Sequence, residues 1–308
     1  MSPNSFAIFI SVCLLCLSAC TNVERAGSAE ITDTRDVRLE SLRADIKKVE
    51  PFFKPMGIPG RYDWLWENKE GGQTFDEYIS GNPTLPTDER KIIYVQPIGK
   101  FNTQQSQVIK TTSGYLEVFF GLPVKTLPIK PPPPKLKEPD QRMIDYPQHR
   151  QVRSGYYLDK ILPALLPKDG AALIAFTDED LYPDPTMNYV FGQASLENRV
   201  GVWSLFRLDD QATFDTFLRR TMKIAAHETG HMFSFRHCTK YECVMSGSNH
   251  IVETDRWPID ACPECMAKIC WMNKEKPLDR YKRLVAFAKK YRLNVEAADF
   301  EKKIVAVR

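Results

Sequence analysis

The chain has 308 residues, of which 43% are hydrophobic and 26% are charged, a balance that is ordinary for a globular protein with one large core or two modest ones. Its formal net charge is only +3 and its basic residues are scattered along the chain. The composition therefore gives no support for a nucleic-acid-binding protein and points to no other particular partner.

The N-terminus carries an apolar run, Phe6 to Leu17, that is too short to span a bilayer as a helix but suits a secretory signal. The run ends in Leu17-Ser18-Ala19-Cys20, which resembles the lipobox of a bacterial lipoprotein. No Lys or Arg precedes it, so a plain cleaved signal and an uncleaved anchor stay open. We expect residues 1–20 to be a signal peptide and acylated Cys20 to anchor an exported protein to the membrane of a bacterial cell envelope, with a secreted or periplasmic form as the alternative.

Two further segments precede the main domain. Residues 21–35 are small, polar and charged without an apolar period, which predicts a flexible tether. Apolar residues recur at helical spacing from Val37 to Phe53 and predict a helix. Residues 55–89 are rich in Gly, Pro and aromatic residues, which predicts an irregular element packed on the main domain or, alternatively, a rim that contacts substrate. We assign 36–90 to an N-terminal extension and 91–308 to one domain.

The first half of this domain alternates strand and helix signals. Its continuous apolar run, Ala171 to Thr177, suits a strand buried on both faces. The prolines of segment 128–139 predict a stiff surface loop. Asp178-Glu179-Asp180 is interpreted as a solvated loop rather than an acid–base cluster, because buried acids are scarce. The other predicted elements are strands at 92–95, 124–127, 189–194 and 200–206, and helices at 103–120 and from Ser154 to Leu166.

A predicted helix from about Phe214 to Phe233 contains the pattern His227-Glu228-Thr229-Gly230-His231. Histidines four apart share one face of a helix and can bind one zinc ion, and Glu228 beside them can take a proton from water. With His237, three imidazoles leave a tetrahedral zinc one open position, as in a catalytic site. A helical histidine is more often a surface or core residue than a ligand, but three of the five histidines fall in this eleven-residue window.

Cysteines follow at two short spacings, Cys238 with Cys243 and Cys262 with Cys265. Four thiolates at these spacings can hold a second, closed and therefore structural zinc. In an oxidising compartment each close pair could instead form a disulfide. Cys270 is interpreted as a buried thiol.

Together these residues resemble the signature of the archaemetzincins, a metallopeptidase family of the metzincin clan. The likeness rests on His227-Glu228-x-x-His231, His237-Cys238, Cys243-Val244-Met245 and Cys262-x-x-Cys265, with weaker support from 191–195 and 247–250, and it runs from about residue 91 to 271. It implies a catalytic zinc on His227, His231 and His237, Glu228 as general base and acid, Met245 as the methionine of the turn beneath the metal, and a structural zinc on Cys238, Cys243, Cys262 and Cys265.

The resemblance also implies the fold. We expect an α+β fold of the α/β metzincin type: a mixed, twisted sheet of about four or five strands with an antiparallel edge strand, and an active-site helix, in an upper half at 91–233. A mostly helical lower half follows at 234–308, including amphipathic helices at Pro277–Tyr291 and 293–308. The edge strand, to which a substrate peptide adds as an extra strand, consists of Tyr189, Val190, Phe191, Gly192, Gln193 and Ala194.

One position departs from the family pattern. Ser234 stands where the family has glycine, which commonly leaves the helix through a left-handed conformation that costs other residues ~1 kcal/mol. The position of His237 therefore depends on the backbone conformation of Ser234. His250 is either a surface-loop residue or a wall of the substrate cleft.

The sequence thus predicts a monomeric zinc metallopeptidase with two zinc ions per chain, acting on a peptide or protein. The alternative is a catalytically weak, zinc-stabilised peptide-binding surface lipoprotein. A zinc-finger-like regulator of nucleic acid conflicts with the leader and with the unclustered charge.

Overall fold

The computed structural model describes residues 24–308, with side chains from residue 37 onward. The predicted signal peptide and the predicted lipidation site, Cys20, lie outside these residues. The chain divides into an N-terminal unit, 1–40, and a main unit, 41–308. None of the helices within 24–308 combines the length and the apolar character needed to cross a bilayer.

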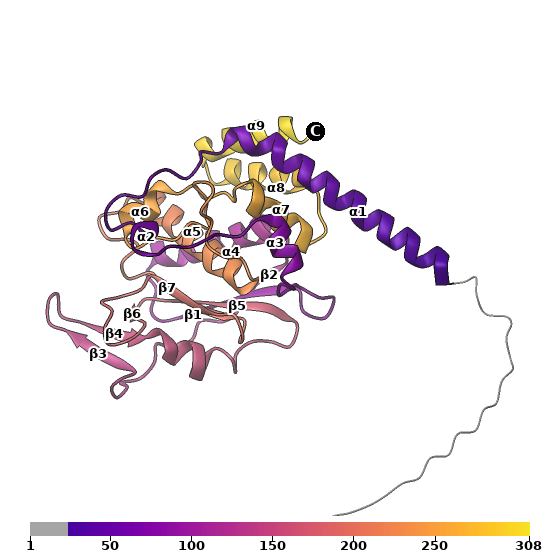
Figure 1. The fold of residues 1–308 in the computed structure, drawn as a ribbon. Helices are drawn as coiled ribbons and strands as arrows, with labels where there is room; N and C mark the ends of the chain where they lie inside the picture. The colour runs from indigo at the N-terminus through magenta and orange to yellow at the C-terminus, as the bar shows by residue number, and fades with distance from the viewer. Residues whose placement is uncertain (1–23) are drawn as a thin grey trace, which may run out of the picture. The chain divides into compact units, whose positions relative to one another are not determined.

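Helix α1 spans Glu24–Val49 and is followed by the 3-10 turn η1 at Glu50–Phe52 (Figure 1). The predicted helix at Val37 to Phe53 is confirmed over most of its length. Residues 24–35, which belong to the predicted flexible tether, are part of this helix.

The extension is largely irregular, as predicted, with short helices α2 at Trp64–Glu67 and α3 at Phe75–Ser80. Thr74 and Glu77 form a capping box that starts α3. The Tyr78 side chain is buried and its hydroxyl donates a hydrogen bond to the Phe233 carbonyl at 3.1 Å. The extension therefore packs on the end of the helix that carries the histidine pattern, which confirms the predicted packing.

The main sheet has five strands in the order β2-β1-β5-β8-β7. Strands β2, β1, β5 and β8 run parallel to one another, and β7 pairs antiparallel with β8 at the edge. Every residue of the central strand β5 is buried. The mixed sheet with an antiparallel edge strand is thus confirmed. The bounds are β1 Ile92–Ile98, β2 Val124–Thr126, β5 Gly170–Thr177, β7 Gly192–Ser195 and β8 Val200–Ser204.

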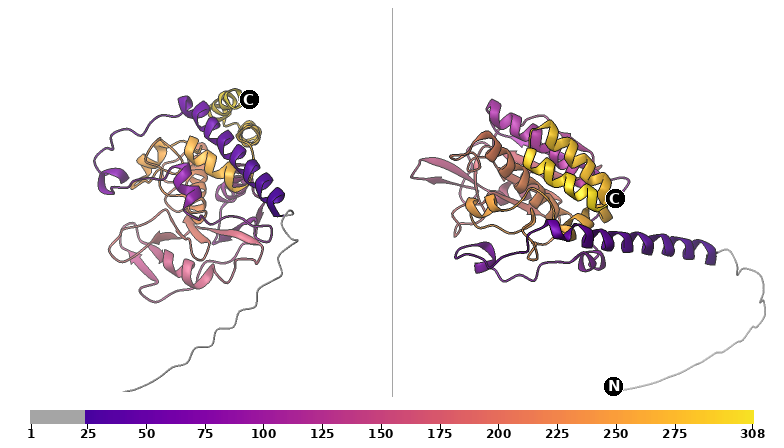
Figure 2. Two further views of the ribbon diagram at one scale, coloured as in Figure 1. Left: turned by 45° about the vertical axis from the view of Figure 1, so that its right-hand side comes forward. Right: turned by 90° about the horizontal axis from the view of Figure 1, so that it is seen from above.

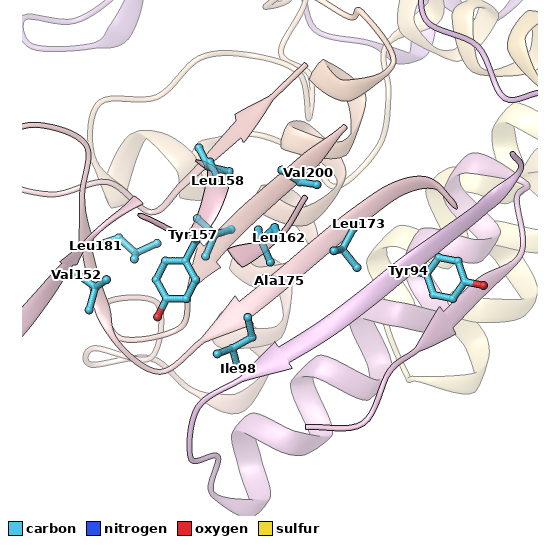
Figure 3. Close-up of a cluster of buried hydrophobic side chains, with 11 residues drawn as sticks. Tyr94, Ile98, Val152, Tyr157, Leu158, Leu162, Leu173, Ala175, Leu181 and Val200 are labelled. Carbon is cyan, nitrogen blue, oxygen red and sulfur yellow. The ribbon is translucent and has the colours of Figure 1, made fainter. Parts of the chain in front are cut away.

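Helices α4, Thr103–Phe120, and α5, Phe214–Met232, lie on the face of this sheet that is uppermost in Figure 1. Both match their predicted ranges closely. On the opposite side, Tyr157 and Leu162 pack against Ile98, Leu173 and Ala175 of the sheet in an apolar cluster (Figure 3). The sheet is therefore covered on both faces, which explains the continuous apolar run of β5.

The predicted helix from Ser154 to Leu166 is confirmed only over its first half: residues 154–155 are helical, and a short π-helical turn, η2, follows at Tyr156–Ile161. Pro163 lacks the N–H that would continue a regular helix. Ser154 does not act as a cap, because its hydroxyl donates to the Tyr182 carbonyl at 3.3 Å and also bonds to the side chain of Gln193.

A second, three-stranded sheet, β3-β4-β6, was not predicted. It contains β3 Gln141–Ile144, β4 His149–Arg153 and β6 Asp180–Tyr182. Asp180 is fully buried in it, and its carboxylate accepts hydrogen bonds from Arg207 at 2.7 Å, His149 at 2.9 Å and Gln151 at 2.7 Å. Burial opposes ionisation, but these bonds leave the pKa of Asp180 below its usual range. The solvated-loop interpretation is therefore wrong for Asp180, which is buried because it is paired.

The lower half is mostly helical, as predicted. Helices α8 and α9 pack side by side near the C-terminus (Figure 2). They carry Arg280 and Lys303, whose side chains bind the buried carboxylate of Asp260 at 3.2 and 2.8 Å. This cluster fixes both helices to the chain just before Cys262. The bounds are α6 Ile251–Arg256, α7 Pro263–Met272, α8 Pro277–Lys290 and α9 Asn294–Ala306.

Candidate metal centre and substrate cleft

Helix α5 presents His227 and His231 on one face. It begins at a Thr213 cap, whose side chain accepts a hydrogen bond from the Thr216 N–H at 3.2 Å, and it buries its apolar face against the sheet and the lower half. The two imidazole rings lie 4.6 Å apart between centroids. The His237 ring lies 5.1 Å from that of His227 and 4.9 Å from that of His231. The structure therefore brings all three histidines together.

The outer nitrogen of each ring has its own acceptor. The Nδ1 atoms of His227 and His231 lie 2.9 and 2.6 Å from the carbonyl oxygens of Val244 and Phe235. Nδ1 of His237 lies 2.9 Å from a carboxylate oxygen of Glu70. With the proton on Nδ1, the lone pair of each Nε2 is available to one metal ion, and the Nε2 atoms of the helical pair are 3.0 Å apart. Burial also lowers the pKa of His227 and of His237, which favours neutral rings.

Ser234 adopts the predicted left-handed conformation, with φ of 66°. Its hydroxyl oxygen accepts a hydrogen bond from the Thr84 N–H at 3.0 Å, and its carbonyl accepts one from the Gln73 side chain at 3.3 Å. A glycine at this position would lack the hydroxyl contact. The side chain thus offsets part of the backbone strain, and His237 reaches the other two histidines without the family glycine.

Two residues that contact His237 have no signal in the sequence. Glu70 binds its Nδ1, and the Trp64 ring meets its ring edge to face, with 4.9 Å between centroids. Both come from the extension, far from the histidine motif along the chain. Only their position in space identifies them as supports of the metal centre.

Replacing Glu70 with alanine should weaken zinc binding at the histidines by about 10–100-fold, because the third imidazole loses the partner that orients it. Glu70→Gln, which keeps an oxygen acceptor, should retain most of the affinity. Competition with a fluorescent zinc chelator measures both variants. Equal affinity for parent and Glu70→Ala would contradict the role of this carboxylate.

Met245 lies directly under the active-site helix. A Cβ atom added to Gly230 of α5 would come within 2.6 Å of the Met245 sulfur, so the glycine is what allows this close approach. The Met245 side chain is buried, and its carbonyl accepts a hydrogen bond from the Cys238 N–H at 2.8 Å. The turn that carries Met245 therefore connects the histidine cluster to the cysteine cluster.

The four cysteines Cys238, Cys243, Cys262 and Cys265 form a buried cluster in which all sulfur atoms lie within 4.8 Å of one another. None of the four forms a disulfide, so neither disulfide of the alternative interpretation is present in the structure. Cys243 Sγ accepts hydrogen bonds from the backbone N–H groups of Met245 at 3.4 Å and Cys262 at 3.2 Å. Such donors favour a thiolate, whereas burial alone raises the pKa of Cys243 and Cys262. The cluster fits a closed tetrahedral zinc site. Cys270 is a buried thiol, as predicted.

A cleft of about 430 Å³ opens beside the histidines. It is lined by all six residues predicted for the edge strand, although the strand itself begins only at Gly192. Trp64 also lines the cleft, which supports the alternative that the extension contributes to its rim. Within the described residues the outer edge of β7 has no neighbouring strand, so its backbone groups are available to an extended peptide.

Glu228 lines the same cleft beside His227, and burial raises the pKa of its carboxyl group. His250 is neither a wall of the cleft nor an isolated loop residue. Its Nδ1 accepts a hydrogen bond from the Glu253 N–H at 3.1 Å and caps α6, and its Nε2 lies 3.4 Å from Asp63. The adjacent Asn249 and Ser248 line the cleft instead.

Comparison with known proteins identifies the family. A family model described as Peptidase family M54 matches residues 146–271. Archaemetzincin-2 of Rattus norvegicus is 33% identical over 268 residues, which cover 76% of this chain and 74% of that protein. The archaemetzincin of Archaeoglobus fulgidus is 30% identical over 177 residues, 58% of this chain and 98% of that protein. The crystal structure of archaemetzincin from Methanopyrus kandleri covers 62% of this chain and 99% of its own, with 27% identity and a TM-score of 0.49. The chain belongs to the archaemetzincins, Peptidase family M54.

Proposed function

We propose that this chain is a zinc-dependent metallopeptidase whose catalytic zinc is held by His227, His231 and His237. The observation that carries the proposal is the set of three imidazoles turned toward one point by acceptors on their outer nitrogens, next to a carboxylate in a substrate-sized cleft. A binding protein without hydrolysis, the alternative from the sequence, is not favoured, because peptide capture alone does not need Glu228.

Zinc bound by three neutral imidazoles supplies Lewis-acid chemistry, which polarises a peptide carbonyl and makes water acidic enough to attack near neutral pH. Glu228 accepts a proton from the attacking water and passes it to the leaving amine. The raised pKa of its carboxyl group suits both roles. An extended substrate pairs antiparallel with β7, which places backbone hydrogen bonds along the cleft and leaves side chains to choose the sequence.

The second half of the proposal is a structural zinc on Cys238, Cys243, Cys262 and Cys265, so that each chain binds two ions. Closed coordination by four thiolates leaves no position for water. Support comes from the buried, converging sulfur atoms and from the N–H donors to Cys243.

Purified protein should therefore contain two zinc atoms per chain by elemental analysis. A mild chelator should remove the zinc of the histidine site and all peptide hydrolysis, while the four-thiolate zinc exchanges slowly. Added zinc should restore the zinc content and the hydrolysis.

The variant Cys243→Ser should lose the structural zinc ion. Because metal binding is coupled to folding, most of this variant should be unfolded. Hydrolysis that is insensitive to complete zinc removal would refute the proposed mechanism.

We further propose that the protein is exported as a monomer and anchored to a membrane by a lipid on Cys20. The support is the apolar run before Leu17-Ser18-Ala19-Cys20 and the polar residues that follow. Membrane fractionation of cells that express Cys20→Ala checks the anchor: unchanged membrane association of this variant would exclude it.

A further inference from the structure

The cleft contains a buried cation that the proposed mechanism does not use. Lys223 lies on α5 one turn before His227 and is only 7% exposed. Of the described residues that line the cleft, it is the one Lys or Arg. Its Nζ donates hydrogen bonds to the carbonyl oxygens of Thr254 at 2.9 Å and Asp255 at 3.2 Å, in the last turn of α6. An ammonium group has three donors, so one remains for a ligand.

Lys223 has no acidic partner in the part of the chain that the structure describes. The nearby carboxylate of Asp255 is held by Arg220 at 2.7 Å, and that of Glu296 by Arg219 at 2.6 Å. Burial lowers the pKa of Lys223 to about 8, although the charge of Asp255 opposes part of this shift. The two carbonyl groups compensate the charge of the Lys223 ammonium group only in part. A carboxylate that enters from the cleft would accept its third hydrogen bond and balance the remaining charge.

The position of Lys223 along a bound peptide follows from contacts between α5 and the sheet. A Cβ on Gly192, at the start of β7, would lie 3.6 Å from Ile224, beside Lys223. A Cβ on Gly201, which pairs with Ala194 further along β7, would lie 3.1 Å from Met232 near the end of the helix. Strand β7 and helix α5 therefore run in the same direction.

A peptide that pairs antiparallel with β7 runs the opposite way. It passes the histidines and then reaches Lys223 with residues on the carboxyl-terminal side of the bond that is cut. Ile224 and Trp257 also line the cleft and offer apolar contact to the methylene groups of a side chain.

We propose that Lys223 makes the enzyme selective for an acidic side chain, aspartate or glutamate, in the residue that follows the scissile bond. This specificity rests on the proposed peptidase function and identifies its substrate class. The carboxylate supplies the counter-ion that Lys223 lacks, and an amide or aliphatic side chain of similar size does not.

The test uses zinc-loaded, full-length protein and peptides that differ only at this residue, with Glu, Gln, Leu or Lys. In the parent, kcat/KM should be at least about tenfold higher for Glu than for Gln, the scale of one charge-assisted hydrogen bond. The Glu-to-Gln ratio should fall to about one in Lys223→Met and in Lys223→Gln, and should recover in Lys223→Arg. If the parent protein cleaves the Glu and Gln peptides with equal kcat/KM, the proposal is overturned, whatever the ratio in the variants.

A purely structural role for Lys223, as a cap on α6, makes a different prediction. The variants would then unfold at lower temperature while the Glu-to-Gln ratio stayed at the parent value, which would overturn the proposal. If the parent cleaves none of the peptides, the peptidase function fails, and the preference is read from binding of the same labelled peptides by fluorescence anisotropy. A Glu preference in binding that Lys223→Gln removes would uphold the acidic subsite, and equal binding of Glu and Gln peptides would reject it.

Discussion

Replacing Glu228 with glutamine is expected to reduce kcat by about 10²–10⁴-fold, the usual contribution of a positioned general base. Glutamine preserves the shape of the side chain, but its amide cannot accept the proton of the attacking water. The three imidazoles keep their outer hydrogen bonds, which do not involve Glu228, so the zinc content should stay at the parent value. Single-turnover hydrolysis together with elemental analysis measures both quantities.

The matched control is Glu117→Gln, the same substitution at an exposed position of α4 outside the cleft. It should hydrolyse peptides at the parent rate. Turnover by Glu228→Gln within a few-fold of that control would exclude Glu228 as the base, even if zinc remained essential.

Replacing Asp260 with asparagine should lower the free energy of unfolding by about 3–5 kcal/mol, as expected when one partner of a buried ion pair is removed. Asparagine keeps a hydrogen-bond acceptor but leaves the charges of Arg280 and Lys303 buried without their carboxylate. Urea denaturation of the zinc-loaded protein measures the loss. A change below about 1 kcal/mol would show that other groups, such as Asp299 beside Lys303, compensate.

The ionisation of Asp260 should also make the free energy of unfolding depend on pH. Burial opposes ionisation of Asp260, but the charges of Lys303 and Arg280 hold its pKa below the ordinary value of 3.8. The native state therefore releases this proton more readily than the unfolded chain. The contribution of Asp260 to the stability of the folded state is thus complete above about pH 4 and is lost as the pH falls further.

The control for Asp260→Asn is the same substitution at the exposed Asp279, which lies 3.9 Å from Lys282. Asp279→Asn should change the free energy of unfolding by less than about 0.5 kcal/mol.

The elements that the sequence predicted well have strong local signals. Helices α4 and α5 and strand β5 agree with their predicted ranges to within one residue at each end, because caps, apolar periods and a continuous buried run mark them. The histidine and cysteine motifs are also local, since their spacing along the chain determines which atoms can meet. For these residues the short-range pattern and the tertiary structure agree.

Other features depend on contacts between residues far apart in the chain. Strands β3, β4 and β6 are short and carry many polar residues, so they have no clear period. Contacts of Asp180 in β6 with His149 and Gln151 in β4 join two of them across about thirty residues of sequence. Glu70 is one of many acids in a segment without regular structure. Nothing local distinguishes such a residue until the fold places it against His237.

The contacts between the extension and the end of α5 make the extension part of the structure that positions the third histidine. Glu70, Gln73 and Thr84 all act on the short stretch that carries Ser234 and His237. A shortened protein starting at residue 91 would keep every predicted zinc ligand. The loop that carries His237 would, however, lose its contacts with the extension. A protein truncated to the region of the motif would thus lack residues that support the zinc site. If such a truncated protein were inactive, this would give no information about the activity of the intact chain.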